Sequence, residues 1–580
     1  MFHKGTAKKA SYFLQPPLSF SHTKFVTFAS VLLTLTGFGM SPAYALEADP
    51  SLIERNFEET NQQRNAVEPK DAGVQQRQKD ASTAVAETAP FTLTAVRLTG
   101  ATVIDGATIA PAYEEFLAAE ISDKELQLIV DRVTALYRDA GYSLSYATLP
   151  PQEITTGVVH LQIIEGAVEG VALSGVADID RYQNYFAGVQ SEKPLRQRTL
   201  ERAILLLNDL SGLTVTDITL DERTDRPGAY QLGLVLARKT IAFSSYLDNR
   251  GTRSVGRIQL GLTGIVNDVL GADEQVSASY FTVPASPQEL QYLRLGYTQP
   301  MGKDGLLLQT SGSYSMVDAG GNLGLVNTES DGVFLQAGLR YPLLRTRPRS
   351  AWLGLSFDYR RSMEENNTGP TFEDTLSVLR GRLDYSADDN WGGQNFATAE
   401  VSQGLSILNA SRPGDTVLSR ADGEGQFTKA HITLYRYQQL VGDALGLILQ
   451  ASGQKSSAPL LSAEEFSLGG ARFGRAYEYS ELTGDSGVAG SAELAYRPDL
   501  GWSFPTFVAL YTFYDIGAVW NRNTVGDARR QSLASAGGGL RFGITENWSA
   551  SVEVGQPLTR IAKRSGDQDP QIFFSLSSSY

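Results

Sequence analysis

The sequence has 580 residues, enough for several domains, and its 64 acidic and 50 basic side chains give a formal net charge of −14. This acidic balance argues against nucleic acid as a partner, because surfaces that bind nucleic acid are basic. The chain has no cysteine, which excludes a disulfide framework and any metal site built on thiolates.

Residues 1–45 have the pattern of a secretory signal peptide. Lysines make its start positive, Phe25 to Met40 form its hydrophobic stretch, and Ala43-Tyr44-Ala45 offers small residues for cleavage after Ala45. The alternative is an uncleaved anchor, but the stretch is shorter than the roughly 20 residues of a membrane-spanning helix. No later stretch of the sequence approaches 18 uninterrupted apolar residues. A mature chain in a membrane must therefore enter it as a closed β-barrel, because lipid does not tolerate unpaired backbone groups.

Two polar segments follow the signal peptide. Residues 46–67 contain a few apolar positions after Asp49-Pro50-Ser51, a sequence typical of a helix start, and predict a short helix. Residues 68–89 are rich in Gln, Lys, Ala and Thr, lack periodicity and indicate a linker. A disordered tail is the alternative for residues 46–67, and the composition does not decide between the two.

Residues 90–166 predict a small α+β domain. Its elements follow the order strand, short helix, amphipathic helix, strand, strand. The apolar residues of the amphipathic helix recur at helical spacing from Leu126 to Tyr137. The predicted elements cover residues 91–98, 112–119, 126–137, 142–149 and 158–164.

Residues 167–238 repeat this pattern and predict a second domain of the same kind. Both domains would have free sheet edges, to which an extended client could add itself as a strand through main-chain hydrogen bonds. Inert spacers are the alternative. The predicted elements of the second domain cover residues 168–173, 182–187, 200–210, 213–220 and 230–237.

From residue 239 to residue 580 the sequence consists of alternating runs of about 9–12 residues, the length of a tilted membrane strand. One side of each run is apolar or aromatic and the other is polar, as the wall of a water-filled barrel requires. A soluble propeller is the competing fold, but the signal peptide, the absence of a blade motif and the terminal Tyr580 disfavour it. The sixteen runs lie near residues 241–250, 256–266, 275–284, 290–299, 305–315, 332–341, 351–361, 376–386, 395–405, 424–437, 444–453, 487–497, 507–519, 533–543, 548–556 and 572–580.

One connection between these runs, residues 468–477, is rich in glycine and arginine. Glycines allow a tight backbone turn, and a buried arginine requires an acceptor. Asp515 is a candidate acceptor, because it lies in an otherwise apolar run, Phe513 to Gly517. The alternative is an arginine in a solvated loop and an aspartate that faces a wet pore.

The two stretches resemble the signature motifs of the two-partner secretion transporters, the TpsB family (ShlB/FhaC/HecB), which are outer-membrane barrels related to BamA. The loop motif of that superfamily, VRGF or VRGY, here reads Gly474-Arg475-Ala476-Tyr477, so two of its four positions depart. The strand motif FxDxG is intact, with Phe513, Asp515 and Gly517. The resemblance implies that the loop folds into the barrel, where Arg475 meets Asp515. Loss of either partner is then expected to leave an inserted barrel that secretes poorly, and a charge swap to restore some function.

The N-terminal segments also resemble parts of these transporters. The run from Leu136 to Tyr142 and the pair Pro150-Pro151 resemble a polypeptide-transport-associated (POTRA) domain. The resemblance implies two POTRA domains, 90–166 and 167–238, in the periplasm. It also implies that residues 46–67 plug the pore.

The fold class expected is thus a transmembrane antiparallel β-barrel of about 16 strands in the bacterial outer membrane, preceded by two POTRA domains. The resemblance implies a pore that recognises an unfolded exoprotein through these domains and translocates it without ATP. The alternatives are a BamA-like assembly factor, which usually has more POTRA domains, and a passive porin. The ending at Tyr580 resembles the signal for outer-membrane assembly, which implies the barrel-assembly machinery and periplasmic chaperones as partners besides the client and lipid.

An enzyme is disfavoured by the sequence. After signal cleavage only His160 and His431 remain, and both lie in strand runs. No motif for a catalytic triad, a zinc protease or a P-loop is present. Acidic pairs in the predicted loops lack metal-ligand spacing, so neither a metal nor a cofactor is expected.

Overall fold

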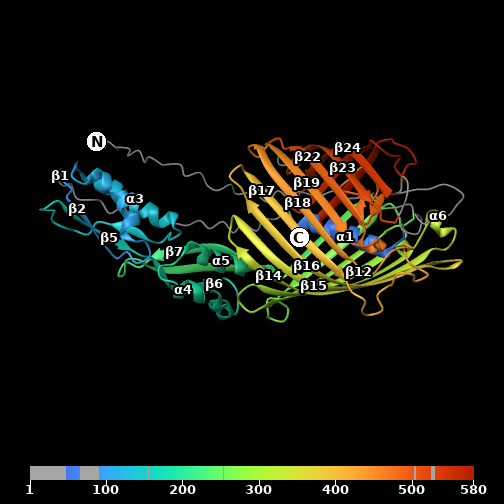
Figure 1. Ribbon diagram of the computed structural model, residues 1–580, viewed down its shortest axis with the longest axis horizontal. Helices are drawn as coiled ribbons and strands as arrows, with labels where there is room; N and C mark the ends of the chain where they lie inside the picture. The colour runs from blue at the N-terminus through green and yellow to red at the C-terminus, as the bar shows by residue number, and fades with distance from the viewer. Residues whose placement is uncertain (1–47, 66–89, 155, 252–253, 502–503, 524–528) are drawn as a thin grey trace, which may run out of the picture.

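The computed structural model describes residues 48–65, 90–154, 156–251, 254–501, 504–523 and 529–580. Two small α+β modules lie in a row at one end of an elongated molecule, and a large barrel forms the other end (Figure 1). The predicted signal peptide, 1–45, and the predicted linker, 68–89, lie outside the described residues.

No helix within the described residues is long and apolar enough to cross a membrane.

The first module is built on a three-stranded sheet in the order β2-β5-β4, in which β2 runs parallel to β5. Its amphipathic helix α3 starts at a capping box between Ser122 and Glu125 and buries its apolar stripe against the sheet. The elements are β1 (Phe91–Thr92), β2 (Ala95–Thr99), α2 (Gly106–Ile109), η2 (Ala110–Ala112), η3 (Glu114–Phe116), β3 (Glu120–Ile121), α3 (Asp123–Asp139), β4 (Tyr146–Thr148) and β5 (Val158–Ile164).

Two predicted elements of this module are divided in the structure. The predicted strand 91–98 is two strands, because the backbone changes partner between Leu93, which bonds Ala119, and Thr94, which bonds Gly157. The predicted helix 112–119 is instead two short 3₁₀ turns, the first of which contains a proline.

The second module has the sheet order β6-β8-β7 and a buried helix, α5. Its predicted helical run 182–187 is the 3₁₀ helix η4 and the start of α4. The two modules are joined firmly, since Leu144 of the first packs in the core of the second and the Tyr146 hydroxyl donates to Glu222 at 2.8 Å. The elements are β6 (Ala167–Ser174), η4 (Ile179–Phe186), α4 (Ala187–Ser191), α5 (Gln197–Asn208), β7 (Leu213–Glu222) and β8 (Ala229–Arg238).

Sixteen antiparallel strands form one closed barrel, in which β26 pairs with β9. Each predicted run overlaps one strand, so the predicted fold class is confirmed. The strands are β9 (Ile241–Asp248), β10 (Gln259–Asn267), β11 (Gln275–Thr282), β12 (Gln291–Met301), β13 (Leu306–Asp318), β14 (Glu329–Arg345), β15 (Arg349–Asn366), β16 (Gly369–Asp388), β17 (Gly393–Gly404), β18 (Thr428–Val441), β19 (Leu445–Ser456), β22 (Ser486–Tyr496), β23 (Val508–Trp520), β24 (Arg530–Gly543), β25 (Trp548–Pro557) and β26 (Gln571–Ser579).

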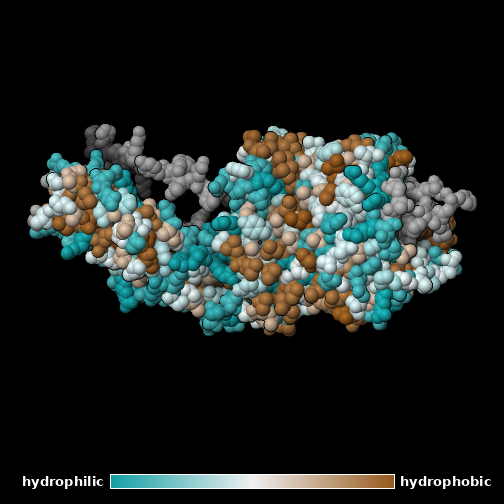
Figure 2. Space-filling view, viewed as in Figure 1, coloured by the Kyte–Doolittle hydropathy of each residue, from teal (hydrophilic) through white to brown (hydrophobic). Residues whose placement is uncertain are grey.

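The strands alternate between an apolar outer face and a polar inner face. On β23, Leu510, Tyr514 and Ile516 are about half exposed on the outside, while Phe513 and Asp515 are buried inside. Figure 2 shows hydrophobic residues gathered over the outer surface of the barrel. This pattern is that of a wall between lipid and a polar lumen.

The second module is docked on the turns at its end of the barrel. The Arg345 guanidinium makes two hydrogen bonds of 2.7 and 2.8 Å with the Asp209 carboxylate, and the Tyr182 hydroxyl donates to Asp273 at 2.8 Å. Burial and the Asp273 carboxylate raise the pKa of Tyr182 to about 12, so the tyrosine stays a donor. Arg238 contacts both partners of this pair.

The barrel closes along a short seam. β26 pairs with β9 from Ser575 and Asp248 to Ser579 and Ser244, and backbone bonds between Tyr580 and Phe243 extend this pairing by one residue, whereas β9 pairs with β10 along its whole length. Ser578 and Ser245 lie opposite each other in this seam, with their hydroxyl oxygens 2.8 Å apart.

The register at the seam predicts a crosslink. We expect the double variant Ser245→Cys, Ser578→Cys to form a disulfide on oxidation, because directly opposed residues place their Cβ atoms within disulfide reach. Non-reducing electrophoresis measures it, and each single variant is the control. The natural chain has no thiol to compete. Failure to crosslink in an inserted barrel would contradict this register.

Candidate functional site

The connection between β19 and β22 folds into the barrel rather than outward. It contains η6 (Ser462–Glu464) and a small hairpin of β20 (Phe466–Leu468) and β21 (Leu482–Gly484). Its apolar side chains are buried against strands β22 to β24 and one neighbouring connection. The apolar cluster consists of Phe466, Leu468, Phe473, Tyr477, Leu482, Ala489, Val519, Leu533 and Ala562.

Glycine at position 474 fits this loop, although it departs from the expected motif. Gly474 has a φ of +102°, and a Cβ there would lie 2.7 Å from Leu533. Its backbone amide donates to Asp515 at 3.2 Å. The departure therefore serves a tight turn that aims two consecutive amides at one carboxylate, since the Arg475 amide also donates to Asp515, at 2.9 Å.

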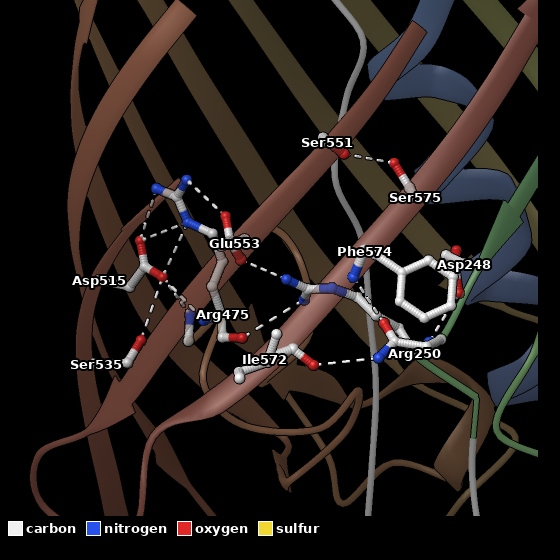
Figure 3. A network of polar contacts seen from close by, with 12 residues as sticks. Asp248, Arg250, Arg475, Asp515, Ser535, Ser551, Glu553, Ile572, Phe574 and Ser575 are labelled. Carbon is white, nitrogen blue, oxygen red and sulfur yellow. Dashed lines mark hydrogen bonds and ion pairs between the residues drawn. The ribbon is translucent and has the colours of Figure 1, made fainter. Parts of the chain in front are cut away.

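The structure brings Arg475 and Asp515 together. The guanidinium of Arg475 contacts the Asp515 carboxylate through Nε and Nη2 at 3.1–3.3 Å. Both residues are buried, with 4% and 0% exposure. The Ser491 hydroxyl also donates to the carboxylate, at 2.7 Å. The Ser535 hydroxyl donates to it at 3.3 Å (Figure 3). Asp515 thus holds the loop through both charge and backbone.

The other predicted site residues lie around this contact. The Phe513 ring lies under the Arg475 guanidinium, 3.8 Å from its central carbon. A Cβ at Gly517 would lie 2.4 Å from Leu468, so glycine lets the loop approach the wall. Tyr477 is fully buried, and its hydroxyl accepts from the Arg560 amide at 3.0 Å.

Tyr580, predicted as an assembly signal, lies apart from this loop. It pairs with Phe243 of β9 through its backbone, and its hydroxyl accepts from the Trp548 indole at 2.7 Å. The terminal residue therefore contributes to the barrel seam, and its role in assembly stays a prediction.

Arg475 belongs to a larger cluster of six charged side chains, which the two motifs do not indicate. Glu493 on β22 bridges Arg475 and Arg541, with 2.5 Å contacts to each. Glu553 on β25 pairs with Arg250 (Figure 3). It also accepts from the Tyr511 hydroxyl at 2.8 Å. The arginine–carboxylate cluster consists of Arg250, Arg475, Arg541, Glu493, Asp515 and Glu553.

The cluster is balanced, with three arginines and three carboxylates. A signal for it exists in the sequence, because three glycines in a row interrupt the strand at residues 537–539. Side chains at Gly537 and Gly539 would collide with the rings of Phe513 and Tyr511, on which the guanidiniums of Arg475 and Arg541 lie. Glycine inside a strand marks such a close approach.

A helix, α1 (Pro50–Asn65), lies inside the barrel (Figure 1). The described part of residues 46–67 is therefore helical, as one of the two interpretations of the sequence predicted, and not a disordered tail. Asp49 caps its start by accepting from the Ser51 amide at 2.8 Å. Arg55 donates to the Tyr479 hydroxyl at 2.8 Å and to the Glu465 carbonyl at 2.6 Å. The whole connection between β19 and β22 is called the arginine-bearing loop below. The helix and this loop therefore share the lumen and touch each other.

Two families of known proteins match this chain, one over most of the barrel and the other over the first module. Residues 235–542 match the family of haemolysin secretion/activation proteins ShlB/FhaC/HecB, and residues 91–166 match the POTRA domain, ShlB-type. The protein belongs to the ShlB/FhaC/HecB family. As a member, it is an outer-membrane β-barrel transporter protein of two-partner secretion, with its POTRA modules in the periplasm. The predicted family and location are confirmed.

Similar members of the ShlB/FhaC/HecB family are transporters. The heme/hemopexin transporter protein HuxB of Haemophilus influenzae (strain 86-028NP) is 22% identical over 78% of this chain and 80% of its own length. The outer membrane transporter CdiB of Dickeya dadantii (strain 3937) is 23% identical over 91% of this chain and 94% of its own. The structure of CdiB from Escherichia coli has the same fold, with a TM-score of 0.69 at 20% identity, over 94% of this chain and all of that one.

Proposed function

We propose that the protein exports an unfolded exoprotein, of the haemolysin, haemagglutinin or adhesin kind, through its barrel to the cell surface. The observation that carries this proposal is the content of the lumen. Two segments that are not part of the wall, α1 and the arginine-bearing loop, occupy it, and buried ion pairs and hydrogen bonds fix each of them to the wall in addition to apolar packing. A passing chain can offer such charged and polar contacts in their place, so export can proceed by exchange of these segments.

The periplasmic modules support a role in receiving the client. Within the described residues, the edge strands are β2 and β4 in the sheet of the first module and β6 and β7 in that of the second. Such edges offer main-chain groups to an extended chain and read little of its sequence. The docking of the second module on the barrel turns keeps the edge strands β6 and β7 close to the barrel.

The energy for export is proposed to come from the client rather than from ATP. Folding of the client outside the cell would make backward sliding unfavourable, and the sequence has no P-loop. A passive porin needs neither the modules nor the arginine-bearing loop, and assembly factors of the BamA type usually have more modules. The names of the relatives, which are transporters, agree with export.

Purified protein in liposomes tests this function. We expect a urea-unfolded exoprotein, encoded by the gene next to this one, to become protected from external protease without any nucleotide. Liposomes without the protein are the control, and detergent must abolish the protection. Absence of protection, or protection only after ATP is added, would refute the proposal.

A further inference from the structure

Next to α1, the barrel wall has a row of four side chains that the strand register places side by side on adjacent strands. Arg294 on β12 lies opposite Ser313 on β13, which lies opposite Phe334 on β14, which lies opposite Arg360 on β15. All four point into the lumen, while Leu293 and Leu295 beside Arg294 are about half exposed outside. We call Arg294, Ser313, Phe334 and Arg360, together with Tyr292, the wall receptor.

One carboxylate of α1, that of Glu54, is enclosed by the wall receptor. Arg360 contacts Glu54 Oε2 at 2.5 Å, the Tyr292 hydroxyl donates to Oε1 at 3.4 Å, and the Ser313 hydroxyl donates to the same oxygen. Arg294 lies 4.0 Å from Oε1. Glu54 is only 3% exposed. A buried carboxylate with this number of donors occupies a formed binding site.

Aromatic rings complete the site on both sides of the carboxylate. The ring of Phe57, one helical turn after Glu54, packs against Phe281 and Tyr292 with centroid distances of 5.4 and 5.0 Å. Phe334 lies between the two arginines, 4.6 Å from the guanidinium of Arg360 and 5.9 Å from that of Arg294. The site therefore holds a carboxylate and, one helical turn later, an aromatic ring of α1.

The negative partners of these two arginines come from α1 and not from the wall. Within the described residues, the ion pairs of Arg294 and Arg360 are with Glu54 and Glu58. Arg380 is different, because it pairs with Asp358 of the adjacent strand. Among the described residues outside α1, none has a carboxylate within ion-pair distance of either guanidinium. Removal of one side of a buried pair is unfavourable, so another carboxylate is attracted.

We propose that the wall receptor binds an acidic–aromatic segment of the exported chain, and that α1 is an internal stand-in for this segment. The chemistry required is that of Glu54, Phe57 and Glu58, which lie on one face of the helix at spacings of three and four residues. Because both occupants need the same arginines, arrival of the client segment and departure of α1 are one exchange. The identity of the occupant as a client rests on the proposed export function, whereas the site itself does not.

The absence of cysteine allows a direct test in the full-length protein. The Ser330 side chain is 6% exposed and donates to the Ala48 carbonyl, so a thiol introduced by Ser330→Cys is covered while α1 is bound. We expect added Glu54→Gln to increase the rate of thiol labelling. We expect a synthetic peptide of residues 48–58 to reduce this rate again. The same peptide with Glu54→Gln should give equal protection only at a concentration at least about tenfold higher.

Two further variants decide where the peptide binds. Arg360→Gln should remove the difference between the two peptides, while Arg361→Gln, one residue along and 46% exposed at its side chain, should leave it unchanged. Equal protection by both peptides, or a thiol that stays unlabelled in the Glu54→Gln protein, overturns the proposal.

The outcome is separable from the export function, because labelling needs no client. A protein that exports normally but shows no selective peptide protection refutes this inference alone. A protein with selective protection that exports no client refutes the proposed function alone.

Discussion

Arg475→Ala is expected to give a barrel that inserts normally but exports less than about a tenth of the client. The change leaves Asp515 and Glu493 as buried carboxylates without a shared cation, and breaking a buried pair costs about 3–5 kcal/mol. This free energy shifts the balance between the docked and the undocked loop by roughly 10²- to 10⁴-fold. Client in the culture medium measures export, and the heat-dependent gel mobility of the barrel measures insertion.

Arg382→Ala is the matched control for this experiment. Arg382, on strand β16, is likewise an arginine paired with an aspartate, but it contacts only Asp384 and Thr398 among the contacts described, and its side chain is 41% exposed. Pairs this exposed contribute about 0–1 kcal/mol, so export should stay near normal. Equal export by the two variants would show that Arg475 does not hold a functional loop.

The structure changes one expectation about this pair. The sequence suggested that a swap of the two charges would restore some function. Asp515, however, accepts hydrogen bonds from the amides of Gly474 and Arg475 as well as from two serines. An arginine at that position has no acceptor for these donors. We now expect the swapped variant to export as poorly as either single change.

The fold could be predicted from the sequence because its signals are local. Alternation along β23 is visible within thirteen residues, and the amphipathic stripe of α3 within seventeen. The predicted boundaries were wrong where a change of backbone hydrogen-bond partner, rather than the side-chain pattern, ends a strand. An example is the boundary between Leu93 and Thr94. Pattern alone cannot detect such a change of partner.

The arginine–carboxylate cluster could be predicted only in part. Arg475 and Asp515 lie in recognisable motifs, but Arg250 and Glu553 are about 300 residues apart and meet only through barrel closure. The wall receptor was missed for the same reason, since Arg294 and Arg360 become neighbours through the register of four strands. Single charges on inward positions look alike until the register is known.

Glu54→Lys is expected to drive α1 out of the lumen and open the pore. The substitution replaces the carboxylate that faces Arg294 and Arg360 by a third cation in an almost completely buried site. The lost attraction and the new repulsion should disfavour the bound helix by about 3–5 kcal/mol, so the open fraction should rise by roughly 10²-fold or more. Conductance of the purified protein in planar lipid bilayers measures this, and Glu54→Gln should give an intermediate value. A variant as closed as the natural protein would show that α1 is not held by its charge.

A second substitution, Arg360→Glu in the Glu54→Lys protein, is expected to close the pore again. This differs from the Arg475 and Asp515 pair for a structural reason. The donors to Glu54 within the described residues are side chains, of Arg360, Tyr292 and Ser313, and no backbone amide is among them. Hydroxyls can turn to accept as well as donate, so the reversed pair keeps its partners. Rescue at Glu54 without rescue at Asp515 would separate a helix held mainly by charge from a loop held also by its backbone.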